Sequence, residues 1–446
     1  MSSVFQLRAR LRSRAAWSLL WLGSTSVPGL AADLSPTTQA TAAVATPAQA
    51  KLGLSDLIRA VVQNNPGLIA SRRSAEAAGA AVTSASALPN PRLEIGTGRS
   101  SARLPNAIAG ATAGWAVSQF IENPDLRRAR IAAAEHGERG SAQQVAVNTN
   151  ELVAQVRVKA FEYLLRQEEA DAAADAFALL EQIRSRVKVR VESGEAARYE
   201  IIKADAEIIN AQQKLLSARL QVEQAALAIN RLAAGALPPW TLAERLGDTL
   251  ETPELDEIKQ YSAQNNPEIK ALKALLAQRE ARLREVQASR WPGIEVRMQQ
   301  ARDPELRQAM VVASMQIPLL DQRSGPVAEA VAERERARGL LEGRQAELNQ
   351  QLLMAWKAME LARVRVKALS TGAVREADAA LRVAEAAYRF GERGILDVLN
   401  AQRLVRAVRA DLLDARFQLQ IANVDLDYLA GRYADALSPA ASSVQP

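Results

Sequence analysis

A long internal repeat restricts the fold of this chain more than any other feature. The tetrapeptide Gln-Asn-Asn-Pro at 63–66 returns 201 positions later at 264–267. Further along the chain the offset is 197 positions, and it pairs Gly194-Glu195 with Gly391-Glu392. The chain is therefore a tandem duplication of a unit of about 200 residues, much longer than the roughly 20–50 residues of a solenoid repeat. We expect an architecture of two similar halves.

Composition indicates long helices and excludes the usual catalytic sites. Charged residues make up 24% of the 446 residues and aromatic residues only 4%, a mixture typical of coiled coils rather than of compact cores. The chain has no cysteine, and His136 is its single histidine. This excludes thiol catalysis, cysteine-based zinc sites and Ser/His/Asp triads. We therefore expect no enzyme activity, no cofactor and no bound metal.

The distribution of charge gives no sign of nucleic-acid binding. The chain has 56 basic and 50 acidic side chains, which leaves a formal net charge of +6. The two signs alternate along the helical stretches, as on a solvated helix surface, and no basic run is interleaved with aromatic residues. We therefore expect no nucleic acid among the partners.

The first residues have the pattern of an export signal. Several arginines precede a short apolar core at 15–22, and small residues follow at 29–32. We expect a signal peptide over 1–32 and a flexible leader over 33–51. A basic amphipathic helix is the alternative interpretation of these residues. No later stretch reaches the ~20 uninterrupted apolar residues of a membrane-spanning helix, so we expect an exported chain without a transmembrane helix.

Each copy of the repeat has the same order of predicted elements: a short helix, two strands and a long helical hairpin. We expect a first helix from near Leu54, capped by Ser55 or Asp56, and a second helical segment that starts at Pro66. The predicted boundaries are 52–236 for the first repeat, 237–253 for a linker, 254–432 for the second repeat and 433–446 for a disordered C-terminal tail.

The residues after Pro91 alternate between apolar and polar, and so do those of the second copy. A period of two is typical of a strand with one apolar and one polar face. Return strands are predicted over 112–121 and 309–318, so each copy contains a hairpin. The apolar residues of these strands are Leu93, Ile95, Ile294, Val296 and Met298, and the polar ones are Glu94, Glu295 and Arg297. In a membrane channel built from these strands, we expect the apolar set to face lipid and the polar set to face the lumen.

Two very long helical stretches follow the hairpins, at 125–192 and 327–389, and neither contains an interior proline. Apolar residues recur there at steps of three and four, the pattern of a helix packed against other helices. At ~1.5 Å per residue each stretch reaches ~100 Å. Reversals are expected at Gly194 and Gly391, with returning helices over 197–234 and 395–431.

The strands and helices together predict a channel made of several chains. Strands of roughly nine residues have the length that crosses a bilayer. Four strands cannot close a barrel, and an open edge in lipid leaves unpaired amides, so closure needs more chains. Trp115 and Trp291 are expected at strand ends, where interfacial aromatic residues lie. A soluble helical protein with two short hairpins is the alternative.

Several motifs resemble those of the TolC family of outer-membrane efflux proteins. The resemblance covers about residues 52–432 and includes the duplicated Asn-Pro motif and the Pro-Asn-Pro strand entry. Its most specific part is 388–402, where Tyr-Arg-Phe-Gly precedes Leu-Asp-Val-Leu-Asn-Ala-Gln. The segments 316–323 and 325–330 are most similar to the cobalt–zinc–cadmium (CzcC-like) branch. Residues 122–128 depart from the glycine-lysine-arginine pattern of that branch.

The resemblance implies a mainly α-helical fold with a small β part. Long coiled-coil hairpins and four transmembrane strands per chain would close as a trimeric α/β-barrel. This homotrimer would lie in outer-membrane lipid of a Gram-negative-type cell and extend into the periplasm. Its partners would be a periplasmic adaptor protein and an inner-membrane pump, of the RND type. The implied function is a passive conduit for small solutes, such as heavy-metal cations or drugs.

The resemblance also implies that the helix turns form the periplasmic entrance. The matching gate residues are Tyr388, Arg393, Asp397 and Asn400, with Tyr199 and Glu200 on the neighbouring hairpin. We expect Arg393 to bond to Glu200 or to the Tyr199 region, and Asp397 to form a threefold carboxylate ring that favours cations. An ordinary helix-end charge is the alternative for Asp397. The expected adaptor contacts are Glu192, Gly194, Glu195, Gly391 and Glu392.

Two alternative functions stay open from the sequence. The same fold could be the outer-membrane conduit of type I protein secretion, and the neighbouring genes would distinguish the two. A periplasmic coiled-coil scaffold without a pore is the second alternative. It would give no heat-resistant trimer in the outer-membrane fraction.

Overall fold

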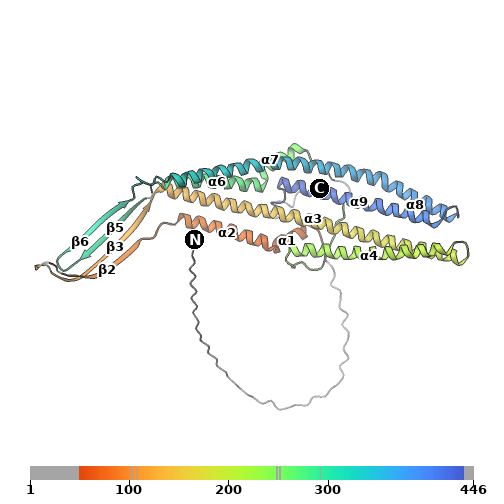
Figure 1. Cartoon of the computed structure of the whole chain (residues 1–446), viewed down its shortest axis with the longest axis horizontal. Coiled ribbons are helices and arrows are strands. Elements are labelled where there is room, and N and C mark those ends of the chain that lie inside the picture. Colours follow the sequence, from red (N-terminus) through yellow and green to blue (C-terminus); the bar gives the residue numbers. More distant parts are fainter. Residues whose placement is uncertain are drawn as a thin grey trace, which may run out of the picture. The chain divides into compact units, whose positions relative to one another are not determined.

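The computed structural model describes residues 50–435, apart from 102, 104, 107, 248, 249, 251, 252 and 292. The expected signal peptide, most of the expected leader and the tail after 435 lie outside the described residues. Within the unit Ala48–Pro446, four strands lie at one end of a set of long helices (Figure 1).

The two halves of the chain have the same order of elements, as the repeat predicts. The first half contains α1 (Leu54–Asn64), α2 (Pro66–Ser86), β2 (Arg92–Ser100), β3 (Gly110–Glu122), α3 (Pro124–Glu192) and α4 (Arg198–Leu232). The second half contains α5 (Leu255–Asn265), α6 (Pro267–Ala288), β5 (Gly293–Arg302), β6 (Arg307–Met315), α7 (Ser324–Ala368), α8 (Val374–Arg389) and α9 (Ile395–Ala430). The mainly helical fold with a small β part is confirmed.

The duplicated Asn-Pro motif begins a helix and anchors it in both halves. The side chain of Asn65 accepts a hydrogen bond from the Leu68 amide at 2.9 Å and donates to the Leu232 carbonyl at 2.8 Å. Asn266 makes the equivalent bond to the Leu429 carbonyl at 2.9 Å. The motif therefore ties the start of one helix to the end of the returning helix. The predicted cap of the first helix is wrong, because α1 begins after Gly53 without a side-chain cap.

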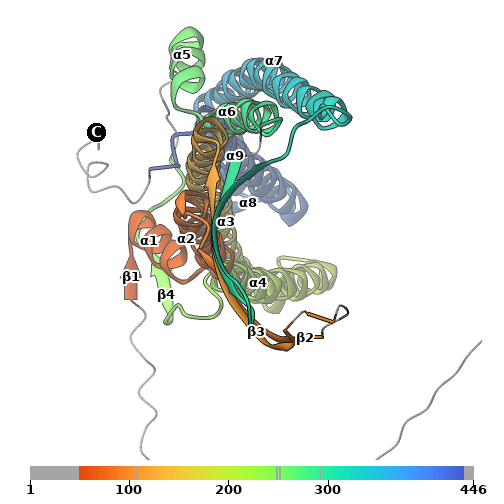
Figure 2. The same cartoon turned by 90° about the vertical axis from the view of Figure 1, so that its left-hand side faces the viewer.

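The four strands form one antiparallel sheet in the order β2-β3-β5-β6, and its strands curve (Figure 2). The predicted hairpins are confirmed, and β3 pairs with β5 to join them. The register sets Leu93, Val117, Met298 and Val311 side by side on one face, which we call the apolar face. The opposite face, which we call the polar face, carries Glu94, Ala116, Ser118, Glu295 and Arg297.

The position of Trp115 differs from the prediction. We expected it at a strand end, but β3 begins at Gly110, and Trp115 lies inside the strand between Ile95 and Gln300. Its indole nitrogen donates to Oε1 of Gln300 at 3.1 Å. The alternation of small residues from Gly110 to Gly114 carries too little apolar signal to show where the strand begins. Trp291 lies just before β5 and is exposed.

The sheet joins the helices through a short polar junction. Asn123 caps α3 by accepting from the Asp125 amide at 2.9 Å, and it donates to the Trp291 carbonyl of the other half at 2.9 Å. The largely buried carboxylate of Glu122 pairs with the guanidinium of Arg130. These bonds fix the direction in which the first long helix leaves the sheet.

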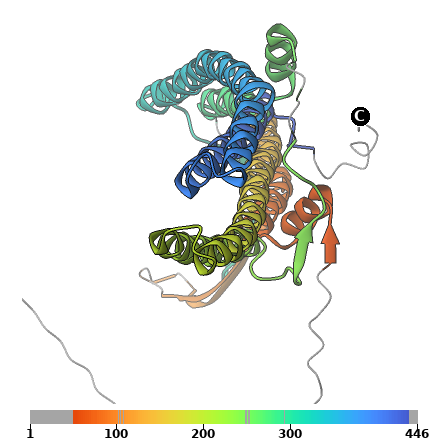
Figure 3. The same cartoon turned by 90° about the vertical axis from the view of Figure 1, so that its right-hand side faces the viewer.

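The long helices pack around clusters of buried apolar side chains. One cluster joins α1, α3 and the end of α4, a second joins α7 with α9, and a third lies beside the turns and joins α3, α4 and α9. Figure 3 faces the end of the helices at which the hairpins turn. The second long helix is interrupted by a π-helical turn, Leu369–Ala373, which the sequence did not predict.

Two short segments have more structure than we expected. Ala50–Leu52 (β1) and Trp240–Leu242 (β4) pair as a parallel two-stranded sheet, although we assigned them to a leader and a linker. Trp240 is buried, and its ring centroid lies 4.8 Å from that of Tyr163. Strands of three residues are too short to show a period of two.

Tyr433 belongs to the range expected to be a disordered tail, but it is buried in the first cluster. Its amide donates to Oδ1 of Asn150 at 3.0 Å, and its hydroxyl donates to Oδ2 of Asp427 at 3.2 Å. The Arg157 guanidinium lies 4.7 Å from the ring centroid. Burial, with the Asp427 charge beside it, raises the pKa of the Tyr433 hydroxyl. The end of the repeat is thereby fastened to α3.

Candidate functional site

The two helix turns have nearly the same backbone, as the repeat predicts. Gly194 and Gly391 have φ of +80° and +75°, in the left-handed region that favours glycine. The residue after each glycine closes the turn: the amide of Glu195 donates to the Arg190 carbonyl at 2.9 Å, and that of Glu392 donates to the Ala387 carbonyl at 3.0 Å. The predicted reversals are confirmed. The adaptor contacts expected on these turns stay a prediction.

The first turn has charged side chains that tie it to the second hairpin. Arg190 Nε lies 3.7 Å from Oε2 of Glu195, and the guanidinium carbon of Arg190 lies 4.7 Å from the ring centroid of Tyr388. A guanidinium over an aromatic ring is attracted by the ring quadrupole. Arg190 is a contact that the sequence did not reveal, because no spacing relates it to a residue on another hairpin.

The second turn has a different charge pairing. Arg393 Nη1 lies 3.6 Å from Oδ2 of Asp397, one helical turn further along the same chain. Within one chain, the described contacts join Arg393 neither to Glu200 nor to the Tyr199 region, the two partners that we expected. Because both side chains of the observed pair are largely exposed, the pair contributes only ~0–1 kcal/mol. Tyr199 is exposed, with Lys203 Nζ 5.5 Å from its ring centroid, and Asn400 is exposed too.

Two gate candidates have buried oxygens without a partner in this chain. Oε2 of Glu200 and the hydroxyl of Tyr388 are both inaccessible to solvent and make no hydrogen bond. A buried polar group without a partner costs roughly 1–3 kcal/mol.

A groove of about 570 Å³ lies between the two hairpins, toward the turns. Its walls come from α3, α4, α8 and α9 and are mostly apolar, with Ala176, Leu179 and Leu381 among the lining residues. Gln402 lies in this groove and is buried, and its Nε2 has no hydrogen-bond partner. The groove therefore offers apolar surface and one buried donor.

The polar face of the sheet carries one ion pair across a strand. Arg297 Nη2 lies 2.6 Å from Oε2 of Glu94, and β3 runs between the strands that hold them. Small residues of β3, Ala116 and Ser118, lie below this pair. All five residues expected to face lipid share the apolar face, and their contact with lipid stays a prediction.

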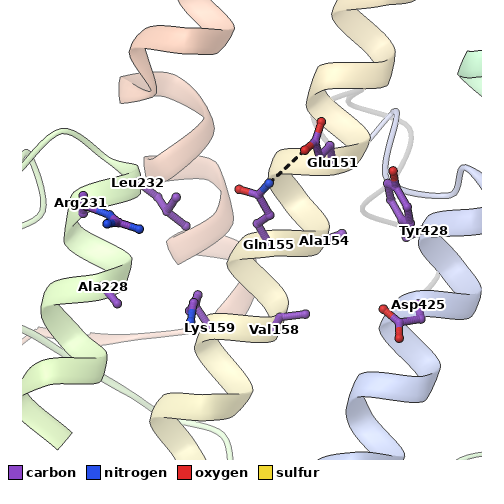
Figure 4. A pocket seen from close by; sticks show the side chains of 10 residues that line it. All are labelled: Glu151, Ala154, Gln155, Val158, Lys159, Ala228, Arg231, Leu232, Asp425 and Tyr428. Carbon is purple, nitrogen blue, oxygen red and sulfur yellow. Dashed lines mark hydrogen bonds between the residues drawn. The ribbon is translucent and has the colours of Figure 1, made fainter. Parts of the chain in front are cut away.

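A smaller pocket of about 370 Å³ lies between α3, α4 and α9 (Figure 4). Glu151 accepts a hydrogen bond from Gln155 at 3.1 Å on one side of it. Asp425 and Tyr428 enter from α9 (Figure 4). Enclosure raises the pKa of the Asp425 carboxyl, although the residue keeps an exposed edge, and burial raises that of the Tyr428 hydroxyl. The pocket has no nucleophile paired with a base.

No group of three His, Cys, Asp or Glu side chains that could hold a metal ion occurs among the described residues. In the same part of the chain, no helix is long and apolar enough to span a membrane.

Comparison with known proteins agrees with this architecture. The sequence matches the family described as outer membrane efflux protein over residues 57–235 and 259–432. It is 27% identical over 376 residues to the cobalt-zinc-cadmium resistance protein CzcC of Cupriavidus metallidurans, covering 83% of this chain and 87% of CzcC.

Solved structures of outer-membrane and transmembrane channels have the same fold. CusC gives a TM-score of 0.74 at 16% identity, with 85% of this chain and 92% of CusC covered. The open state of the Neisseria gonorrhoeae MtrE outer membrane channel gives 0.72 at 19% identity, with 85% and 88% covered.

Proposed function

Because the chain belongs to the outer membrane efflux protein family, we propose that it forms an outer-membrane channel through which a tripartite exporter releases small solutes. Members of the family are channels and not enzymes. The channel would be a homotrimer that spans the outer membrane and extends into the periplasm. The observation that supports this assembly best concerns two helix surfaces that are buried against each other inside the chain. The equivalent surface of each, in the other copy of the repeat, is exposed.

These surfaces are related by the offset of 197 residues. Inside the chain, Val424 of α9 (0% exposed) and Leu164 of α3 (4% exposed) belong to one core cluster. Their equivalents are Leu227 of α4, which is 67% exposed, and Leu361 of α7, which is 70% exposed. A second copy that sets its α7 against α4 would repeat between chains the contact that α3 and α9 make within one. Repetition of this contact around a rotation axis would close a ring of chains.

The apolar stripe on α4 extends along the whole helix. Its exposed members are Ile202, Ile209, Leu216, Leu220 and Leu227. Successive members are seven or four residues apart, which sets them on one side of the helix. A row of large apolar side chains on one helix face is the pattern of a surface that another helix covers.

The sheet has two open edges that suit the same assembly. β2 and β6 are the outer strands, and all neighbours in the sheet are antiparallel. β6 of one copy beside β2 of the next would therefore continue the antiparallel order. Pairing of these edges satisfies the backbone groups that lipid leaves unbonded.

Heavy-metal cations are the cargo that we propose, and drugs of similar size are the second candidate. The likeness to a cobalt-zinc-cadmium resistance protein supports this choice. Asp397, repeated at each copy's turn, would give an acidic ring at the periplasmic entrance that attracts cations. The carboxylate of Glu200, which is partly exposed, would accept a hydrogen bond from Arg393 of a neighbouring copy and hold the entrance closed.

The adaptor and the pump would dock at the same end. The proposed adaptor contacts are the two turns, with Glu192, Glu195 and Glu392 exposed there. The apolar groove beside them suits a helical segment of the adaptor. An RND-type pump in the inner membrane would supply the energy.

Assembly is tested by charging the α4 stripe. Leu227→Glu would place a carboxylate at the proposed contact, and we expect the trimer to weaken more than tenfold because a buried unpaired charge is costly. Gln221→Glu adds the same charge about 100° around the helix from Leu220 and should leave the trimer intact. Native mass spectrometry in detergent measures both. An unchanged mass for Leu227→Glu would refute the proposed contact.

A further inference from the structure

The apolar face of the sheet changes from apolar to cationic at the end farthest from the helices. Arg99 of β2, Arg302 of β5 and Arg307 of β6 are all exposed and, by the strand register, all lie on this face. Arg302 is directly opposite Arg307 across the hairpin. Like charges that are directly opposite destabilise a sheet, so this pair favours a bound anion.

In the part of the chain that the structure describes, none of these three arginines forms an ion pair with an acid. The strand positions of the apolar face hold no carboxylate. The two acids of the nearby loop bind backbone amides: Asp303 accepts from Leu306 at 2.6 Å, and Glu305 accepts from Ile108 at 2.5 Å. Within the described residues, no hydrogen bond or ion pair involves the three arginines. The cationic charge is therefore available to a ligand outside the chain.

The distance of the arginines from the start of the sheet matches the thickness of the apolar part of a membrane. From Ile294 to Arg302 along β5 the strand advances about 25 Å, at ~3.3 Å per residue. With a strand tilt of ~35–45° this is ~20 Å across the bilayer, close to the ~25 Å of the apolar band of outer-membrane proteins. Trp115 and Gln300 lie one row closer to the helices than Arg302. The arginines would thus lie among the lipid head groups on the side of the membrane away from the helices.

We propose that Arg99, Arg302 and Arg307 bind the phosphate groups of phosphorylated glycolipids in the outer leaflet. The planar guanidinium donates two parallel hydrogen bonds to a phosphate, and basic side chains beside a membrane attract anionic head groups. The adjoining apolar band favours a phosphate that belongs to a lipid over a free anion. This inference rests on the proposed outer-membrane location.

The test compares lipid binding by the purified, detergent-solubilised protein and its variants. The probes are bisphosphorylated lipid A, the same lipid without phosphates, and inorganic phosphate. The triple variant Arg99→Gln, Arg302→Gln, Arg307→Gln should bind lipid A about 100-fold more weakly, at about fivefold per arginine. The control Arg92→Gln removes a cation from the polar face of β2 and should bind lipid A like the native protein.

Each result bears on the proposal separately from the channel function. Three results would overturn the proposal. The triple variant would bind lipid A as tightly as the native protein, or the native protein would bind the phosphate-free lipid equally well. The third is full displacement of lipid A by inorganic phosphate at the same concentration as the lipid. Replacement of all three residues by lysine keeps the charge, so it should restore most of the affinity and shows that a weak glutamine variant is folded. The triple variant should still form channels in a planar bilayer, which reports on the conduit alone.

Discussion

The two helical hairpins derive from one duplicated unit but differ in continuity. α3 is a single helix of 69 residues, whereas its equivalent in the second half is divided into α7 and α8 by the π-helical turn Leu369–Ala373. In this turn the Thr371 hydroxyl donates to the Lys367 carbonyl at 2.7 Å. A π-helical turn replaces the regular hydrogen bonds by bonds between residues five apart and disturbs the ladder. We infer that the second hairpin contains the flexible point of the helical part.

The returning helices differ in what covers them. Leu399 of α9 is 3% exposed within the cluster beside the turns, whereas Ile202, its equivalent in α4, is 59% exposed. One surface of the ancestral unit is therefore used inside the chain in the second copy and is left open in the first. In the proposed ring of identical chains, a neighbouring chain would cover this open surface.

The largest expected effect on stability comes from replacing Leu399, and its equivalent Ile202 should behave differently. Leu399→Ala should lower the free energy of unfolding by about 2–5 kcal/mol at every protein concentration, because it leaves a cavity in a buried cluster. Ile202→Ala should weaken assembly instead, so it should lower the free energy of unfolding only at protein concentrations at which the trimer forms. Unfolding in detergent over a range of concentrations measures both. A concentration-independent loss of the same size for Ile202→Ala would remove the distinction.

The turns should respond alike because their backbones are alike. Alanine at Gly194 or Gly391 should cost about 1–2 kcal/mol of stability, because a left-handed backbone strains any residue with a Cβ. Gly339→Ala is the matched control: the site lies inside α7 with nothing within 4 Å of the added Cβ, and it should gain about 0.5–1 kcal/mol. Unequal losses at the two turns would show that the copies diverged there.

Hydrogen exchange tests the flexible point directly. Amides of the π-helical turn should exchange about tenfold faster than those of the equivalent residues 172–176 of α3, because a weaker ladder opens at lower cost. Mass spectrometry of peptides from both helices measures this ratio. Equal protection would mean that the π-helical turn is as rigid as continuous α-helix.

The smallest effect on stability belongs to the Arg393–Asp397 pair. Arg393→Ala should change the free energy of unfolding by at most ~1 kcal/mol, because the pair is exposed. It should nevertheless raise single-channel conductance, since the first turn has Ala196 at the equivalent position and cannot replace the charge. Arg393→Lys should keep the native conductance. Native conductance in Arg393→Ala trimers would exclude Arg393 from the gate.

Local patterns in the sequence predicted the elements but not the contacts between distant segments. The period of two predicted the strands, and Gly194 and Gly391 marked the turns. The three-residue strands β1 and β4, the start of β3 and the burial of Tyr433 lack any such pattern. The contact of Arg190 with Tyr388 depends on how two hairpins pack, which no spacing encodes. The π-helical turn was missed because its residues fit an α-helix equally well.

Ion conductance of the purified protein in a planar bilayer, with its oligomeric mass determined in parallel, tests the central claim most directly. The account predicts discrete, cation-preferring channels from a trimer. A monomer or dimer that forms no channels would contradict it and would leave a helical scaffold as the better interpretation.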